Sequence, residues 1–248
     1  MRRLGITLLA LAAAAALVAG CGDDGDDSVA ASTTTTTDDE TTTTAPADDE
    51  LPGEDVDFFF EDGDELAVVG VEAGDTLNVR AGPGVDFDVV AELAPLATDV
   101  APTGRHRSLD GAGIWTEVRT DDGGTGWVNA AFLAYLGLTD DVTTEIAADP
   151  ADLPSAATML ELGDAVAATR IAADGSDGPV PDVVVVDGPS VGDLGEITID
   201  IVGLPDDSGL GERLHLFATP SEDGKSFTVR TVERTILCRR GAADGFCL

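Results

Sequence analysis

The pattern of apolar and polar positions divides the chain into distinct stretches. Residues 6–18 are almost entirely Leu, Ala, Val and Ile, whereas residues 22–55 are rich in Asp, Glu, Thr and Ala and contain no basic or aromatic residue. Further on, short β-type runs lie between Gly, Pro and Asp, and one stretch repeats apolar residues at helical spacing. The pattern predicts a mainly β protein behind an apolar leader and a segment that cannot bury a core.

Six of the β-type runs lie between residues 63 and 138, at the close spacing of a small all-β barrel. The expected strands are Leu66–Val71, Thr76–Arg80, Phe87–Leu93, Thr98–Pro102, Ile114–Thr120 and Gly126–Asn129. The sequence Gly104–Arg107, which contains His106, is expected to form a solvated turn. The aromatic run Phe58–Phe60 is too apolar to stay in water, so we expect it to pack on the domain that follows.

Residues 139–248 predict an α+β domain with one helix followed by an antiparallel sheet. Pro154 and Ser155 are typical of a helix start, and apolar residues then recur at helical spacing until Asp174, although Gly163 weakens the helix. The expected strands are Val180–Val186, Glu196–Val202, Arg213–Thr219 and Phe227–Cys238. A segment of about a hundred residues is long enough to bury its own core.

The leader has the three parts of an export signal. Arg2 and Arg3 precede the apolar run, and the small residues Ala19 and Gly20 follow it. A permanent anchor helix is the alternative, but the run is shorter than the roughly 20 residues that a membrane-spanning helix needs. We therefore expect residues 1–20 to be a cleaved signal peptide.

The sequence LVAGC at Leu17–Cys21 resembles the lipobox of bacterial lipoprotein precursors. The resemblance implies that the Cys21 thiol is acylated, that the chain is cleaved just before it, and that lipid holds the protein to the extracytoplasmic face of the cell membrane. Two or more acyl chains give stable anchoring, at about 0.8 kcal/mol per buried CH₂. Residues 21–62 would then be an acidic, Thr-rich, disordered stalk, either plain or O-glycosylated.

The other two cysteines, Cys238 and Cys247, lie close together near the end of the sequence. An exported protein meets oxidising surroundings, so we expect these two residues to form a disulfide. A metal site is the alternative, but neighbouring His or further Cys ligands are lacking. The sequence predicts no metal and no cofactor.

Charge limits the classes of partner. The chain has 13 basic and 48 acidic residues, a formal net charge of −35. Long-range repulsion opposes binding to nucleic acid or to an anionic lipid surface, so we expect no nucleic-acid partner. The acidic surplus suits solubility outside the cell.

Three motifs in the barrel segment carry a resemblance. Leu77–Gly84 has the sequence LNVRAGPG, which resembles the opening signature of the bacterial SH3 domain. Trp115–Val118 resembles the family's Trp-x-x-Val strand, and Gly123–Leu133 resembles its ending, with Phe132 at the aromatic position. The resemblance covers about residues 63–138. It implies a small SH3-like barrel that is a non-catalytic binding module for cell-wall peptidoglycan or for peptide segments.

Planar rings and bidentate donors suit sugar faces and peptide carboxylates, which gives a set of candidate ligand-binding residues. They are Asn78, Arg80, Trp115 and Tyr135, with Trp127 considered beside them. Each has a structural alternative. Trp127 and Phe132 would be core residues, Trp115 would be largely core, and Arg80 would pair with an acidic neighbour.

The favoured function is a lipid-anchored, non-enzymatic binding or adaptor protein that engages peptidoglycan or an envelope protein. The alternative is an envelope hydrolase with its site in residues 139–248. Its constituents would be Ser190, Asp206, Asp207 and His215.

Two apparent signals for chemistry in this segment are weak. Gly188–Gly192 matches Gly-x-Ser-x-Gly, but a nucleophile elbow needs a helix directly after the serine, and the sequence predicts a turn followed by a strand. Asp206–Ser208 is not part of a twelve-residue Ca²⁺ loop. We therefore expect neither a catalytic nor a metal site.

Overall fold

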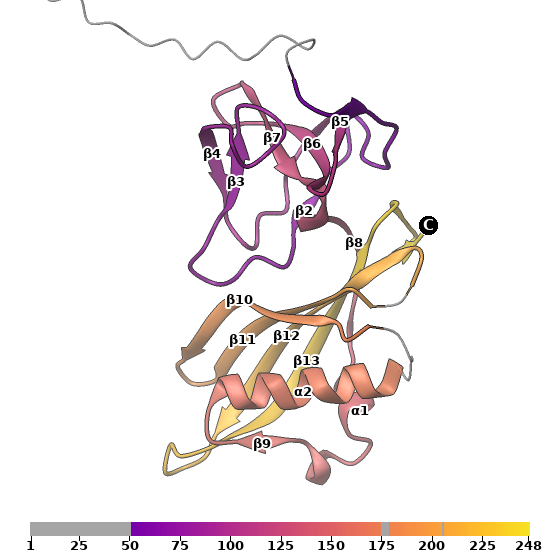
Figure 1. The fold of residues 1–248 in the computed structure, drawn as a ribbon. Coiled ribbons are helices and arrows are strands. Elements are labelled where there is room, and N and C mark those ends of the chain that lie inside the picture. Colours follow the sequence, from indigo (N-terminus) through magenta and orange to yellow (C-terminus); the bar gives the residue numbers. More distant parts are fainter. Residues whose placement is uncertain (1–50, 175–178, 205) are drawn as a thin grey trace, which may run out of the picture. The chain divides into compact units, whose positions relative to one another are not determined.

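The computed structural model describes residues 51–174, 179–204 and 206–248 (Figure 1). These residues belong to one compact unit. The expected signal peptide, Cys21 and the expected stalk up to residue 50 lie outside the described residues. Within the described part, no helix is long and apolar enough to cross a membrane.

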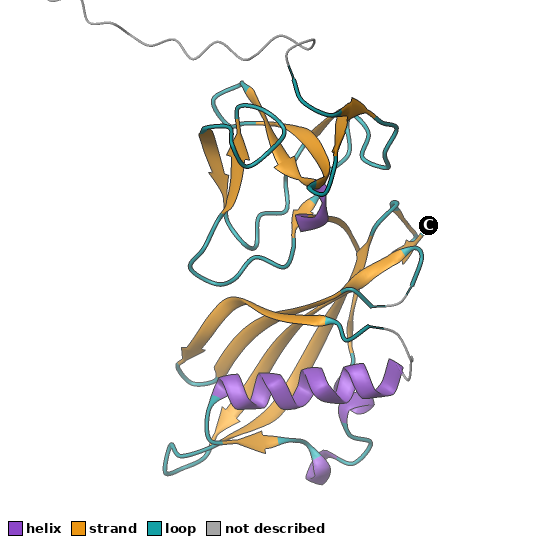
Figure 2. Ribbon diagram, viewed as in Figure 1, coloured by secondary structure: helices purple, strands orange, loops and turns teal. Residues whose placement is uncertain are grey.

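The first part of the described chain, residues 51–138, forms an antiparallel β-barrel, here called the barrel region (Figure 2). Its main sheet has the strand order β1-β5-β6-β7-β3-β4, while β2 pairs with β8. The strands are Glu54–Asp55 (β1), Ala67–Val68 (β2), Leu77–Arg80 (β3), Val89–Leu93 (β4), Pro102–Leu109 (β5), Gly113–Arg119 (β6), Thr125–Asn129 (β7) and Leu133–Asp141 (β8). A 3₁₀ turn over Ala130–Phe132 connects β7 and β8.

Alternation along β3 builds the barrel core. Leu77 and Val79 are buried and Asn78 and Arg80 are half-buried, as the alternating sequence predicts. Gly126 on β7 lies so close to β3 that an added Cβ would come within 2.5 Å of the Val79 side chain. Glycine is therefore needed where these strands meet.

Residues 51–62 were expected to belong to the stalk, but they pack on the barrel region. Leu51 is 8% exposed and packs with Trp115 and Trp127, and β1 pairs with β5. Phe60 is 2% exposed and Phe58 packs partly buried on the same core, which confirms the expected packing for these two residues, whereas Phe59 is 43% exposed. Leu51 and Phe60 belong to the barrel region rather than to a stalk, because burial removes their apolar side chains from water.

The expected solvated turn at Gly104–Arg107 is wrong, because these residues belong to β5. His106 is 5% exposed and each of its ring nitrogens has a partner. Two of the expected strands are shorter than predicted. Leu66–Val71 is reduced to β2 because the Gly70 N–H donates to the Asp200 carboxylate, and before Pro102 only a bridge between Leu66 and Val100 forms.

Residues 139–248, here called the C-terminal region, contain a sheet with the order β10-β11-β12-β13-β8 and one long helix, α2. The strands are Ser155–Ala156 (β9), Asp182–Val191 (β10), Gly195–Val202 (β11), Gly209–Pro220 (β12), Phe227–Cys238 (β13), Ala242–Ala243 (β14) and Phe246–Cys247 (β15). The helical segments are Thr143–Ile146 (α1), Pro150–Asp152 (a 3₁₀ turn) and Met159–Asp174 (α2). The helix followed by an antiparallel sheet confirms the α+β prediction.

The helix α2 lies across one face of this sheet (Figure 1). It begins at Met159, later than predicted, because Thr158 caps it and Ser155 lies in β9. Thr158 Oγ1 accepts a hydrogen bond from the Glu161 N–H, and the Glu161 carboxylate accepts one from the Thr158 N–H, both at 3.2 Å. A Cβ at Gly163 would come within 2.5 Å of the Ile199 side chain, so this glycine lets the helix approach the sheet.

A buried ion pair joins the two regions. Arg213 Nε and Nη2 donate to the Asp200 carboxylate at 2.7 and 2.8 Å, and Asp200 is fully buried. Arg213 Nη2 also donates to the Val68 carbonyl, and the Gly70 N–H donates to Asp200, both at 2.8 Å. The strand β8 also continues across residues 138 and 139, so β2 and β13 pair with different parts of one strand.

Candidate binding site

A groove of about 310 Å³ lies on the barrel region and contains three of the four candidate residues. Asn78, Arg80 and Trp115 line it, together with Val85 and Phe132. The other lining residues are Gly70, Val71, Glu72, Asp75, Thr76, Leu77 and Asn129. We call this cavity the barrel groove. It combines aromatic, apolar and charged side chains on one surface.

Arg80 reaches the barrel groove because β3 alternates and sends its side chain away from the core. Its Nη1 donates to the Phe87 carbonyl at 2.8 Å. No ion pair to Arg80 forms among the described residues, so the expectation that it pairs with an acidic neighbour is wrong. A backbone carbonyl takes the place of that carboxylate, and Glu72 and Asp75 line the same groove without forming an ion pair with Arg80.

The aromatic residues of the barrel divide between core and groove. Trp127 is 3% exposed and Trp115 4%, which confirms both as core residues. The Trp115 indole N–H is buried and has no hydrogen-bond partner in the described structure. Phe132 is 37% exposed, so its assignment to the core is wrong. It closes the 3₁₀ turn capped by Asn129, which places its ring at the groove.

Tyr135 does not line the groove. Its hydroxyl lies 2.6 Å from the Phe59 carbonyl, and it also contacts the Asp64 carboxylate. Burial, followed by the hydrogen bond and charge of Asp64 and then the charge of Glu61, raises the pKa of Tyr135 above its usual range. The structure therefore gives Tyr135 a role in fastening the segment before β2 to the barrel.

The sequence analysis missed Val85 and Phe132 as groove residues. Val85 follows the Gly82–Gly84 turn and is 70% exposed, an unusual position for a large apolar side chain. The signal in the sequence was a valine directly after a Gly-Pro-Gly turn, where no strand pattern required it.

His106 forms a buried polar cluster inside the barrel. Its Nε2 lies 2.8 Å from the Phe60 carbonyl and its Nδ1 lies 3.1 Å from Thr116 Oγ1. A carbonyl can only accept, so Nε2 carries the proton and Nδ1 accepts from the threonine hydroxyl. Burial lowers the pKa of His106, although the Phe60 hydrogen bond opposes this shift.

The residues of the alternative hydrolase site lie apart. Ser190 on β10 is opposite Glu196 on β11, whereas His215 on β12 is opposite Thr198 on β11. One strand separates the serine and the histidine, and their partners on β11 are two residues apart, which places the two backbones roughly 12 Å apart. Ser190 lies in β10, just after a register shift between Asp187 and Ser190, rather than in the expected turn.

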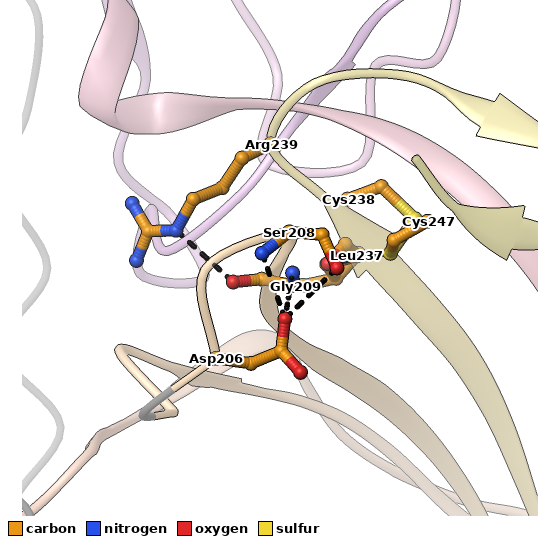
Figure 3. The surroundings of a disulfide bond; sticks show 7 residues. All are labelled: Asp206, Ser208, Gly209, Leu237, Cys238, Arg239 and Cys247. Carbon is orange, nitrogen blue, oxygen red and sulfur yellow. Dashed lines mark hydrogen bonds between the residues drawn. A yellow bond between two sulfur atoms is a disulfide. The ribbon is translucent and has the colours of Figure 1, made fainter.

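The acidic loop before β12 is held by hydrogen bonds of its own (Figure 3). Asp206 Oδ1 accepts from the Ser208 N–H and hydroxyl and from the Gly209 N–H, at 2.8, 3.0 and 2.6 Å. These bonds, with that of Gly209 the largest, lower the pKa of Asp206. Asp207 is exposed. In the part of the chain that the structure describes, no group of His, Cys, Asp and Glu residues could hold a metal ion.

The expected disulfide is present. Cys238 and Cys247 are joined, with their Cα atoms 5.1 Å apart (Figure 3). The bridge connects the end of β13 to β15 and closes the loop that contains β14.

A cavity of about 560 Å³ lies in the C-terminal region near this bridge. Its arginines are paired: Arg170 contacts both Glu212, at 2.9 Å, and Glu145, while Arg234 contacts Asp140 at 2.8 Å. Both arginines that line this cavity therefore have a carboxylate partner.

Comparison with known proteins agrees with the geometry of the barrel. Residues 75–134 match the family model described as the bacterial SH3 domain. Searches of curated proteins and of solved structures give no significant match. The matched segment contains β3 to β7 and most of the barrel groove. Residues 75–134 are therefore similar to the bacterial SH3 domain, a similarity that suggests a binding module.

Proposed function

We propose that the chain is a lipid-anchored binding or adaptor protein on the extracytoplasmic face of the cell membrane, and that its barrel groove engages the cell wall or an envelope protein. The single observation that carries the proposal is that Arg80 lines the barrel groove without forming an ion pair among the described residues. This guanidinium lines a groove with Trp115 and Phe132 and has no carboxylate partner among the described residues.

The remaining basic residues show why Arg80 is unusual. Most basic side chains in the described part pair with a carboxylate, as a chain with 48 acidic residues makes easy. Those that pair are Arg105, Arg107, Arg119, Arg170, Arg213, Lys225 and Arg234. An unpaired guanidinium beside aromatic rings suits a ligand that brings its own carboxylate and a flat or apolar body.

A matched pair of variants tests the groove. Arg80→Gln should weaken retention of the full chain on purified sacculi, or on a captured envelope protein, by about tenfold, the loss of one charge-assisted hydrogen bond. Arg119→Gln removes the same charge from an exposed ion pair on the same barrel and should have little effect. Thermal unfolding of both variants checks that the barrel is intact.

Two results would contradict the groove. Equal weakening by both variants would mean that only net charge matters. Failure of the wild-type chain to bind sacculi or any envelope protein would remove the binding role from the barrel.

The lipid anchor rests on the resemblance at Cys21 and has its own test. Intact-mass measurement of the exported protein should show an amino terminus at Cys21 with the added mass of acyl chains, and Cys21→Ser should remove that mass because the thiol is the acyl acceptor. Finding mature protein without added lipid would overturn the anchor and leave the groove proposal standing.

The non-enzymatic part of the proposal is supported by the positions of the hydrolase residues. Ser190 and His215 lie on strands separated by β11, and Asp206 is occupied by hydrogen bonds within its own loop. Ester or peptide hydrolysis that is lost in Ser190→Ala would revive the hydrolase.

A further inference from the structure

A second cavity, of about 470 Å³, lies beside the aromatic run that precedes the SH3 domain. Phe58, Phe59 and Phe60 line it, with Ile114 and Leu133 from the barrel region. The remaining lining residues are Ala112, Gly113, Asn129, Ala130, Ala131, Leu210 and Arg239. We call it the Phe pocket. Its size and mostly apolar lining are those of small-molecule sites.

Two neighbouring arginines give the Phe pocket a positive rim. Arg239 Nε donates to the Gly209 carbonyl at 3.0 Å, and Figure 3 shows its terminal nitrogens pointing away from the Asp206 carboxylate. The Arg240 guanidinium lies 5.1 Å from the centre of the Phe59 ring. Neither arginine forms an ion pair within the described residues, and both are exposed.

This arrangement is uncommon in so acidic a chain. Of the described basic residues, those without a carboxylate partner are Arg80 in the barrel groove, Arg239 and Arg240 at the Phe pocket, and Arg230 on β13. Phe59 meanwhile keeps 43% of its surface exposed beside these charges. An open apolar cavity thus lies beside two guanidinium groups that form no ion pair with a described carboxylate, and both arginines are outside the matched segment 75–134. The Arg239 charge does act at longer range on Asp206, whose pKa it helps to lower.

We propose that the Phe pocket binds an amphipathic anion, an alkyl chain with a terminal carboxylate. The chain lies against the phenyl and aliphatic side chains, and the carboxylate meets Arg239 and Arg240 at the rim. Burial of the alkyl chain supplies affinity, and the guanidinium groups supply the preference for an anion.

The polar groups of the lining favour an alkyl carboxylate over a peptide. Asn129 is the uncharged polar side chain among the lining residues, and both ends of its amide are hydrogen-bonded. Its Nδ2 donates to the Ala112 carbonyl at 3.3 Å, and its Oδ1 accepts from the Ala131 N–H at 3.0 Å. A peptide would bury backbone amides here with few partners, which costs free energy, whereas an alkyl chain has none to satisfy.

Calorimetric titration of the full chain with octanoate tests the proposal. Octanol and octylammonium are the neutral and cationic probes of equal chain length, and a short acetylated peptide ending in Leu-Phe is the peptide probe. We expect octanoate to bind most tightly. Arg239→Gln should weaken octanoate about tenfold and leave octanol unchanged, since only the carboxylate contact is lost.

Arg230→Gln is the matched control. It removes the same charge from an exposed arginine on β13 that does not line the pocket, so octanoate affinity should stay unchanged. Equal losses in both variants, equal affinity for octanol, tighter binding of the peptide, or no binding of octanoate up to its solubility limit would each overturn the proposal.

Discussion

The barrel region and the C-terminal region fill their cores with different side chains. In the barrel, Phe60 packs among Val, Leu and Ala side chains, and both tryptophans of the chain, Trp115 and Trp127, form a separate cluster with Leu51. In the C-terminal region the core is aliphatic. Its largest buried side chains, among them Ile199 and Leu214, come from neighbouring strands covered by α2.

The difference follows from strand length. The strands β1 to β4 have at most five residues, so few positions face the barrel core, and three large rings add buried volume beside its Val, Leu and Ala side chains. The strands β12 and β13 have twelve residues each, and smaller side chains in long alternating rows are enough. The contact between the regions is both polar and apolar: the Asp200–Arg213 pair holds backbone groups of β2 and its following turn, and Val69 packs in a buried cluster with Leu210 and Leu237. Burial of that pair makes the two regions dependent on each other.

Breaking this pair should have the largest effect. Asp200→Asn leaves the Arg213 charge buried without its counter-ion and should lower the free energy of unfolding by about 3 to 5 kcal/mol. Tryptophan fluorescence reports the barrel and far-UV circular dichroism reports α2. If the pair couples the regions, urea unfolding followed by both signals should give one transition, shifted equally.

The control for that experiment removes both charges. Asp200→Leu with Arg213→Met replaces the pair by apolar side chains and should cost less than the single substitution. Two separate transitions in the wild-type protein would show that the regions unfold independently and would contradict the coupling.

Removing the disulfide should have the next largest effect. The bridge closes a short loop, with Cys238 and Cys247 nine positions apart. Cys238→Ala with Cys247→Ala should lower the free energy of unfolding by about 2.7 kcal/mol in the chain-entropy model. The reduced wild-type protein is the matched comparison. A shift seen by circular dichroism but not by fluorescence would again contradict coupling between the regions.

The sequence predicted the local pattern well and the long-range contacts poorly. The range of β13 agrees with the prediction at both ends because turn-forming residues, among them Gly224 and Gly241, bound the strand-like run. In contrast, β5 was missed because Gly104–Arg107 has the composition of a turn. This strand pairs with β6 along the chain and with the distant β1, and His106 contacts the Phe60 carbonyl; local composition does not contain the contacts with β1 and Phe60.

The same limit applied to the binding site. Alternation on β3 correctly placed Asn78 and Arg80 away from the core, and the structure brings both to one groove with Trp115. Tyr135 does not line this groove, because its hydroxyl donates a hydrogen bond to the Phe59 carbonyl in the segment before β2. The Phe pocket was not predicted, since Arg239 meets the Phe58–Phe60 run only in the folded chain.

Removing the helix cap should have a smaller effect. Thr158→Ala loses one side of the reciprocal hydrogen bonds with Glu161 and should lower the free energy of unfolding by about 1 kcal/mol. Thr169→Ala is the control on the same helix. It removes only a bond to the Ala165 carbonyl and should change stability by less than about 0.5 kcal/mol. Urea denaturation measures both, and an equal loss in the two variants would contradict the role of the cap.

The smallest effect should be a dependence on pH that originates in the barrel. Burial lowers the pKa of His106 from its ordinary value of 6.5, so the unfolded chain binds a proton more readily than the folded one. Stability from the neutral imidazole is complete above pH 6.5 and is lost as the pH falls from there toward the lowered pKa. The carboxyl groups with lowered pKa values, such as Asp206 and Asp141, lose their contribution to stability only below their ordinary pKa of 3.8.

The free energy of unfolding is therefore measured between pH 3.8 and pH 6.5, where its pH dependence reports His106. His106→Gln should remove the slope, whereas His215→Gln in the C-terminal region retains His106 and should keep it. A slope that survives in His106→Gln would show that the barrel does not hold this histidine neutral.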